Sequence, residues 1–113
     1  MSMTAVPVLT LTVIAGAALT NGRWVAAATG GVPAAAGRAL GVARTDAAIG
    51  EPLPVDVLGT ASAEAGAAIA KGARVEVDAL GRAVTLAAGV AVGVALEAAA
   101  GAGAKFECLL IPN

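Results

Sequence analysis

The chain has 113 residues, with seven Lys and Arg, eight Asp and Glu and no His, which gives a net charge of −1. Hydrophobic residues make up 58% of it but aromatic residues only 2%, so Ala, Val and Leu supply most of the apolar content. The missing histidine removes the commonest general base and the commonest metal ligand. The single cysteine, Cys108, excludes an internal disulfide and a cysteine–histidine nucleophile pair. We therefore expect no catalytic residue, no metal site and no cofactor.

The distribution of charge limits the partners of the chain. Basic residues are scattered singly, without the block or stripe that marks nucleic-acid binding. The uncharged run at 83–96 is too short for a membrane-spanning helix and contains two glycines. The longer uncharged run at 1–22 lacks the basic start of a secretory signal, and its alternating threonines are typical of a strand. We expect neither nucleic acid nor a membrane as a partner; a signal peptide or anchor at 1–22 is the less favoured alternative.

Eight short runs carry the β-branched residues, the alternation and the flanking turn residues of strands. They lie at 6–14, 23–26, 38–44, 53–58, 74–78, 83–86, 90–96 and 105–111. Turn signals recur about every 8–12 residues, a spacing that favours a sandwich or barrel over an α/β fold. The Ala-rich stretch 61–71 is the exception, because Ala favours helices. We expect at most one short helix in it, near 64–71.

The sequence is similar to itself at a spacing of about fifty residues. Segment 18–25 matches 68–75, and Leu40–Ala43 matches Val92–Ala95. A unit of about fifty residues is too small to bury its own apolar face, so two packed units would close a small barrel and remove most free strand edges. The repeated Gly-Val-Ala run places glycine mid-strand, where it marks a bend or a close backbone approach. Chance similarity in an Ala- and Gly-rich chain is the alternative.

These patterns predict one all-β domain over residues 1–113, a small β-barrel or β-sandwich built from two similar halves. The first repeat is expected at 15–60 and the second at 61–113. Residues 1–14 precede them as an N-terminal strand or an extended arm.

One pair of carboxylates is the only candidate for chemistry. Glu76 and Asp78 lie on the same face of the predicted strand 74–78, where an acid–base pair or two calcium ligands would fit. The clean alternation of this strand favours a solvated outer face instead.

The candidate interface residues come from the N-terminal segment and from the single tryptophan. Trp24 follows Arg23, and both residue types are enriched at the centres of protein interfaces. Burial in the barrel core is an equal alternative for Trp24, and we expect partial burial with an exposed indole edge. The candidate set is Val6, Val8, Leu9, Leu11 and Trp24.

The order of the elements carries a resemblance to a known family. It rests on Leu9–Thr12, Leu40–Ala43 with the following Asp46–Glu51, Ala67–Gly72 leading into Val75–Asp78, and Val92–Leu96. In this order the chain resembles the capsid cement, or head decoration, proteins of tailed phages. The resemblance implies a small β-barrel or β-tulip-like protein on the exterior of the mature head, made in the host cytoplasm. Its partner would be the major capsid protein, whose subunits it bridges, and it would be a homotrimer or, less favoured, a dimer.

Two other functions fit parts of the same pattern. A tail or baseplate β-barrel that forms rings would share the strands, the low charge and the lack of catalytic groups. A small-ligand carrier or enzyme would use the open end of a barrel, but the sequence lacks the convergent polar groups that such a site needs.

Overall fold

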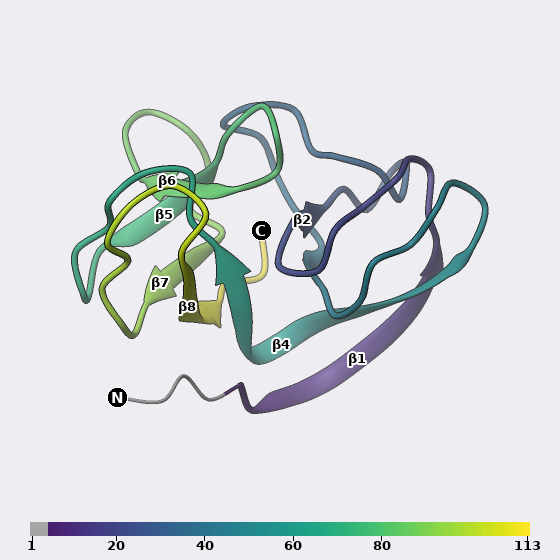
Figure 1. The fold of residues 1–113 in the computed structure, drawn as a ribbon, viewed down its shortest axis with the longest axis horizontal. Helices are drawn as coiled ribbons and strands as arrows, with labels where there is room; N and C mark the ends of the chain where they lie inside the picture. The colour runs from purple at the N-terminus through teal and green to yellow at the C-terminus, as the bar shows by residue number, and fades with distance from the viewer. Residues whose placement is uncertain (1–4) are drawn as a thin grey trace.

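The computed structural model describes residues 5–113, which form antiparallel strands and no helix (Figure 1). The strands are β1 (Pro7–Ile14), β2 (Trp24–Val25), β3 (Gly41–Ala43), β4 (Pro52–Glu64), β5 (Arg74–Val77), β6 (Ala83–Thr85), β7 (Gly93–Ala95) and β8 (Lys105–Leu110). Seven of the eight runs predicted as strands contain one strand each, and the run 53–58 lies within the longer β4. The prediction of a small all-β fold is confirmed.

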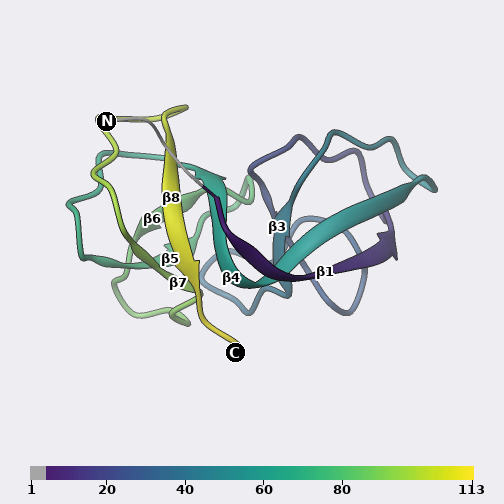
Figure 2. The same cartoon turned by 90° about the horizontal axis from the view of Figure 1, so that it is seen from below.

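All strands belong to one sheet in the order β2-β3-β4-β8-β7-β5-β6, and β1 pairs with β4 outside this path. The long strand β4 bends and connects two lobes that lie side by side (Figures 1 and 2). We call residues 5–58, with β1 to β3 and the start of β4, the first lobe. Residues 60–111, with the end of β4 and β5 to β8, are the second lobe.

No helix forms near 64–71, in agreement with the expectation of at most one: β4 ends at Glu64, and residues 65–71 form turns with isolated bridges at Ala65 and Ile69. Ala61, Ala63 and Ala65 are all fully buried and alternate with less buried neighbours, so the period of burial is that of a strand. Packing of these small side chains within the core of the second lobe outweighs the helix propensity of alanine.

The same strand runs without a break through the boundary expected between residues 60 and 61. Gly59 has a φ of +91°, a conformation that L side chains rarely adopt, and it lies where β4 bends between the lobes. In segment 1–14, residues 7–14 form strand β1 within the first lobe, and residues 1–4 lie outside the described residues.

The two lobes repeat one hydrogen-bond pattern. Strand β2 pairs Trp24 with Val42 on β3, and β5 pairs Arg74 with Val94 on β7 in the same way. Further matches are the bridges Leu19–Ala47 and Ile69–Ala99, and the bonds Gly22 N–Ala43 O (2.9 Å) and Gly72 N–Ala95 O (2.7 Å). Strand β1 runs against the first part of β4 as the end of β4 runs against β8. Thus the first part of β4 is the last strand of the first lobe, and its end is the first strand of the second lobe.

The glycine of the repeated Gly-Val-Ala run has the predicted role. A Cβ atom added to Gly41 would lie 2.9 Å from the carbonyl carbon of Asp56, and one added to Gly93 would lie 2.9 Å from the carbonyl oxygen of Leu109. Both glycines thus permit a close approach of the backbone to the neighbouring strand, which confirms the prediction.

Each lobe has its own apolar core. The first contains Leu19, Val25, Leu53 and Val55, and the second contains Ile69, Val75, Val92 and Phe106. Three residues of the first lobe by sequence, Trp24, Ala39 and Val42, belong to the second core by packing, and Trp24 is the largest of them. The lobes are therefore packed against each other through the tryptophan.

Candidate functional site

Strand β1 has an open outer edge. Among residues 5–113 it pairs only with β4, where Pro54 lies opposite Thr12. The oxygen of Pro54 accepts a hydrogen bond from the N–H of Arg44 on the other side of β4, so Pro54 and Thr12 do not exchange hydrogen bonds. By alternation, the backbone N–H and C=O of Thr10 and Thr12 point away from β4. These groups are available to another strand.

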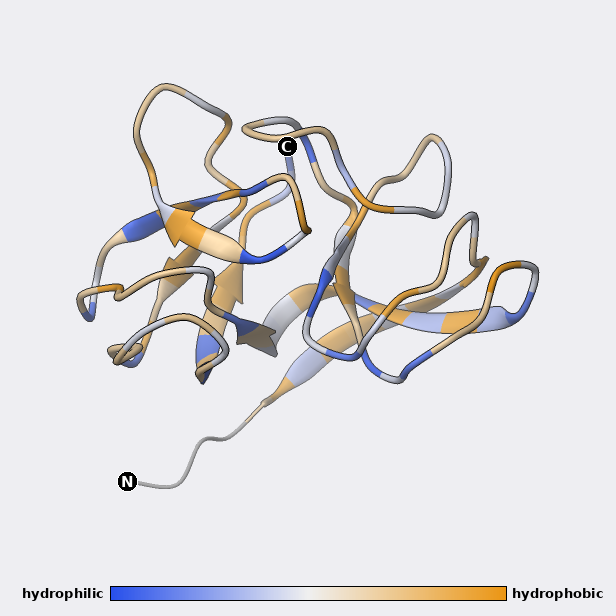
Figure 3. Cartoon of the chain, turned by 45° about the horizontal axis from the view of Figure 1, so that its top comes forward, coloured by the Kyte–Doolittle hydropathy of each residue, from blue (hydrophilic) through white to orange (hydrophobic). Residues whose placement is uncertain are grey.

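Exposed apolar side chains follow the same edge. Val8 is 75% exposed, and Val6, Leu9 and Leu11 are exposed as well, so all four N-terminal candidates lie at the surface. The strand has none of the deep blue that marks charged residues in Figure 3. Open strand edges usually carry lysine, a bulge or a covering segment that prevents pairing with other chains. Strand β1 has an irregular register around Leu9, but no charged residue occurs in segment 1–22, so no lysine or other charge protects this edge.

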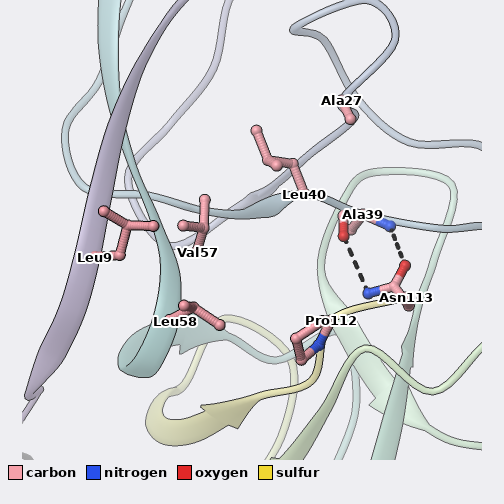
Figure 4. Close-up of a pocket in the computed structure, with 8 residues that line it drawn as sticks. All are labelled: Leu9, Ala27, Ala39, Leu40, Val57, Leu58, Pro112 and Asn113. Atoms are coloured by element: carbon pink, nitrogen blue, oxygen red, sulfur yellow. Dashed lines mark hydrogen bonds between the residues drawn. The ribbon is translucent and has the colours of Figure 1, made fainter.

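A pocket of about 300 Å³ lies beside β1, between the first lobe and the C-terminal residues (Figure 4). Its one polar side chain, Asn113, is already used: the Oδ1 atom accepts a hydrogen bond from Ala39 N (2.9 Å), and Nδ2 donates to Ala39 O (3.0 Å). The pocket thus offers an apolar surface without a free polar side chain. It is lined by Leu9, Ala27, Ala39, Leu40, Val57, Leu58, Pro112 and Asn113.

The structure contradicts the expected exposed edge of Trp24. This side chain is only 1% exposed and belongs to the second core. Gly93 provides the space, since a Cβ atom there would lie 3.3 Å from the indole Cη2 atom. The backbone N–H of Trp24 donates to Gly81 O (2.8 Å), which also ties the two lobes together. Trp24 therefore anchors one lobe to the other within the chain and is not available to a partner.

Polar contacts reinforce this junction of the lobes. Glu64, at the end of β4, lies between two basic side chains: its Oε2 is 3.2 Å from Arg23 Nη2 and its Oε1 is 3.9 Å from Lys105 Nζ. Arg23 also donates to Leu80 O (3.1 Å), and Lys105 donates to Asn21 O (2.5 Å). Because the Glu64 side chain is only 11% exposed, these charges are partly shielded from solvent.

The carboxylate pair at 76 and 78 is structural. Glu76 is buried, and its Oε1 accepts hydrogen bonds from the N–H groups of Ala87 (2.6 Å) and Gly89 (3.1 Å). Oδ1 of Asp78 accepts from the N–H groups of Leu80 and Arg82, both at 2.9 Å. The predicted solvated face is therefore wrong, because each carboxylate satisfies backbone donors of a neighbouring loop.

Cys108 is free and fully buried, and this burial raises the pKa of its thiol to about 12. A thiol with so high a pKa stays protonated and is a poor nucleophile at neutral pH.

Residues 5–113 contain neither a metal-binding cluster of side chains nor a membrane-spanning helix. No group of three or more His, Cys, Asp or Glu side chains is arranged to hold a metal ion. No helix in this range is long and apolar enough to cross a membrane.

The pocket is the part of the site that was not predicted. Leu40, Val57 and Leu58 read as ordinary strand residues, and Pro112 lies outside any predicted element. One signal was present in the repeat: Trp24 aligns with Arg74, so one lobe supplies an aromatic side chain that the other lacks.

The sequence matches the phage cement protein family over residues 3–110. No curated protein matches the chain. Among solved structures, the N base of the head fiber gp8.5 in bacteriophage phi29 is similar, with a TM-score of 0.74 and 20% identity over 91% of this chain and 93% of that one. At this identity the likeness shows a shared fold. The family match covers all eight strands described above, and the chain therefore belongs to the phage cement proteins, a family of structural phage proteins.

Proposed function

We propose that the chain binds the outer surface of the phage head and stabilises the mature capsid by bridging neighbouring subunits of the major capsid protein. The observation that carries this proposal is β1, an uncharged strand with an open edge and exposed valine and leucine side chains. Such an edge favours aggregation of a free protein. In a protein that binds the capsid shell, the same edge provides a binding surface. The family match supports the location.

The stabilising effect follows from repetition. The contact between one β1 strand and the capsid is weak by itself. When linked copies are held on one shell, each later contact forms at a high effective concentration, as in an intramolecular reaction. A protein that binds only the assembled shell shifts the equilibrium towards that shell. We further propose a homotrimer, as the family resemblance of the sequence implies, so that three β1 strands face the head together.

Heads assembled without this chain test the proposal. Purified protein is added to unexpanded and to expanded heads of the phage that encodes it, and binding is followed by co-sedimentation. We expect saturable binding to expanded heads and a higher temperature of DNA release. Absence of binding, or gold-labelled protein that is seen on tails by electron microscopy, would refute it. Mass measurement in solution tests the trimer, and a monomer at all concentrations would contradict it.

A further inference from the structure

The pocket of the first lobe has a counterpart in the second lobe. Leu40 N donates to Val25 O (2.8 Å), and Val92 N donates to Val75 O (2.9 Å), so Leu40 and Val92 occupy the same position in the two lobes. The bonds Arg44 N–Pro54 O and Leu96 N–Glu107 O align β4 with β8 in the same way. By this alignment, the pocket residues Ala27, Leu40 and Val57 correspond to Val77, Val92 and Leu110.

In the second lobe an indole packs beside the corresponding residues: a Cβ atom added to Gly93, which follows Val92, would lie 3.3 Å from Trp24 Cη2. Val77, Val92 and Leu110 are buried in one cluster with Trp24, which comes from the first lobe. In the first lobe, the matching residues surround a pocket of about 300 Å³. The chain thus contains one occupied and one open copy of a place that accepts a large apolar side chain.

This chain does not offer a second indole for the open copy. The residue that corresponds to Trp24 is Arg74, which is exposed and charged. The other aromatic residue of the sequence, Phe106, is fully buried in the second core. A folded neighbour of the same sequence would therefore present no aromatic side chain, so an aromatic filling group would come from a different protein.

We propose that the pocket receives one large apolar side chain, an aromatic one, from a segment of the major capsid protein that extends along the open edge of β1. The volume is at the lower limit of small-molecule sites and suits a single side chain. Leu9 belongs both to β1 and to the pocket wall, so one segment reaches the edge and the pocket together. The open N–H and C=O groups of β1 pair with its backbone, and the buried side chain supplies most of the affinity. This inference rests on the proposed function.

Free indole, the side-chain group of tryptophan, probes the pocket without any capsid. Methyl NMR spectra of the protein are recorded during titration with indole. We expect shifts at Leu9, Leu40 and Leu58. The variant A27W fills the pocket and should lose these shifts, whereas A102W, at an exposed site of the second lobe, should keep them. Shifts that are absent in the unmodified protein, or that persist in A27W, would overturn the pocket as an aromatic site.

The same variants on heads separate the two proposals. Expanded heads that lack the chain are mixed with the unmodified protein, A27W or A102W, each checked for an unchanged melting curve. We expect A27W to bind at least about tenfold more weakly, which is ~1.4 kcal/mol, and A102W to bind normally. Failure of the unmodified protein to bind refutes the proposed function. Equal binding of all three leaves that function intact and refutes the pocket inference.

A photo-crosslinker identifies the occupant. The residue p-benzoylphenylalanine is introduced in place of Leu58, which lines the pocket and is exposed. Illumination on heads is expected to link the chain to the major capsid protein, and digestion should place the link next to an aromatic residue. A link only to another copy of this chain would overturn the inference.

Discussion

The first and second lobes have the same hydrogen-bond pattern but differ in what covers them. Residues at the end of β4 are enclosed: Ala61 is fully buried, and Glu64 is paired with Arg23 from the other lobe. Their counterparts on β1 are Leu11 and Ile14, which are exposed, and the outer edge of β1 is open. The second lobe thus obtains its cover within the chain, and the first lobe lacks one.

This difference shows how a duplicated domain acquires a binding surface. When two identical lobes pack through two different surfaces, each lobe uses one of these surfaces. The other surface of each lobe then has no partner within the chain. Here the satisfied copy has an indole and an ion pair, and the unsatisfied copy has an apolar strand and an apolar pocket. The surface that an internal contact does not cover is the natural place for a partner.

Replacement of Trp24 by alanine should have the largest effect on the comparison. The indole is the largest buried side chain in the second core, and its loss should cost about 3–5 kcal/mol of unfolding free energy in urea. The variant W24F is the matched control and should lose less, because the Nε1 atom of Trp24 has no hydrogen-bond partner in the part of the chain that the structure describes. Added indole should restore part of the stability of W24A. A loss below about 1 kcal/mol would contradict the role of Trp24 as the anchor between lobes.

Substitution at Glu64 should have the next largest effect. Removal of the carboxylate in E64A leaves Arg23 and Lys105 without their shared partner. Both basic side chains are partly exposed, so we expect a loss of about 1–2 kcal/mol rather than the cost of a fully buried pair. The corresponding variant I14A should stay within about 0.5 kcal/mol, because Ile14 is exposed. If E64A and I14A lost the same unfolding free energy, the two lobes would be covered equally and the comparison would be wrong.

The strands could be predicted because their signals are local. Alternation in Arg74–Asp78 and the turn residues around each run depend only on neighbouring positions. The Ala-rich stretch 61–71 shows the limit of such signals, because Ala61 and Ala63 follow the preference of the surrounding sheet rather than the helix propensity of alanine.

The site was harder to predict because it depends on which surfaces of each lobe are covered by the other lobe. No local pattern distinguishes the exposed Leu11 from the buried Val25, since both are apolar residues of alternating strands. Burial of Trp24 depends on the space at Gly93, which is distant in sequence. The alternation of its strand predicts an exposed Glu76, but the loop at 87–89 donates hydrogen bonds to its carboxylate in the folded chain. Contacts between lobes carry this information, and sequence periodicity does not.

A charge on β1 should affect binding and leave the fold unchanged. In V8K the new ammonium lies on a side chain that is mostly exposed, so the unfolding free energy should change by less than about 0.5 kcal/mol. On the open edge, however, it opposes an uncharged partner strand, and we expect head binding to fall by about tenfold. The control T85K carries the same change on an exposed residue of β6 in the second lobe. If both variants bind alike, the capsid does not contact β1.

The smallest expected effect concerns a contact that only the first lobe has. Oδ1 of Asp46 accepts hydrogen bonds from the backbone N–H of Asn21 (2.8 Å) and from its side-chain Nδ2 (3.2 Å). Both bonds lower the pKa of Asp46 below its ordinary value of 3.8, and the bond from the backbone N–H has the larger effect. In the second lobe, segment 94–99 repeats segment 42–47 and places Ala98 at this position, where no carboxylate can form the contact.

The direction of the pH dependence follows from this lowered pKa. The unfolded chain binds a proton at Asp46 more readily than the folded one, so the stabilisation is complete above about pH 4 and is lost as the pH falls through the folded pKa. Urea unfolding of the unmodified protein and of D46A should therefore differ slightly at pH 6 and converge towards pH 2. The carboxyl is fully exposed, which keeps the difference small. A difference that stays constant down to pH 2 would show that the carboxylate charge does not hold this turn, and that the lobes differ here in shape alone.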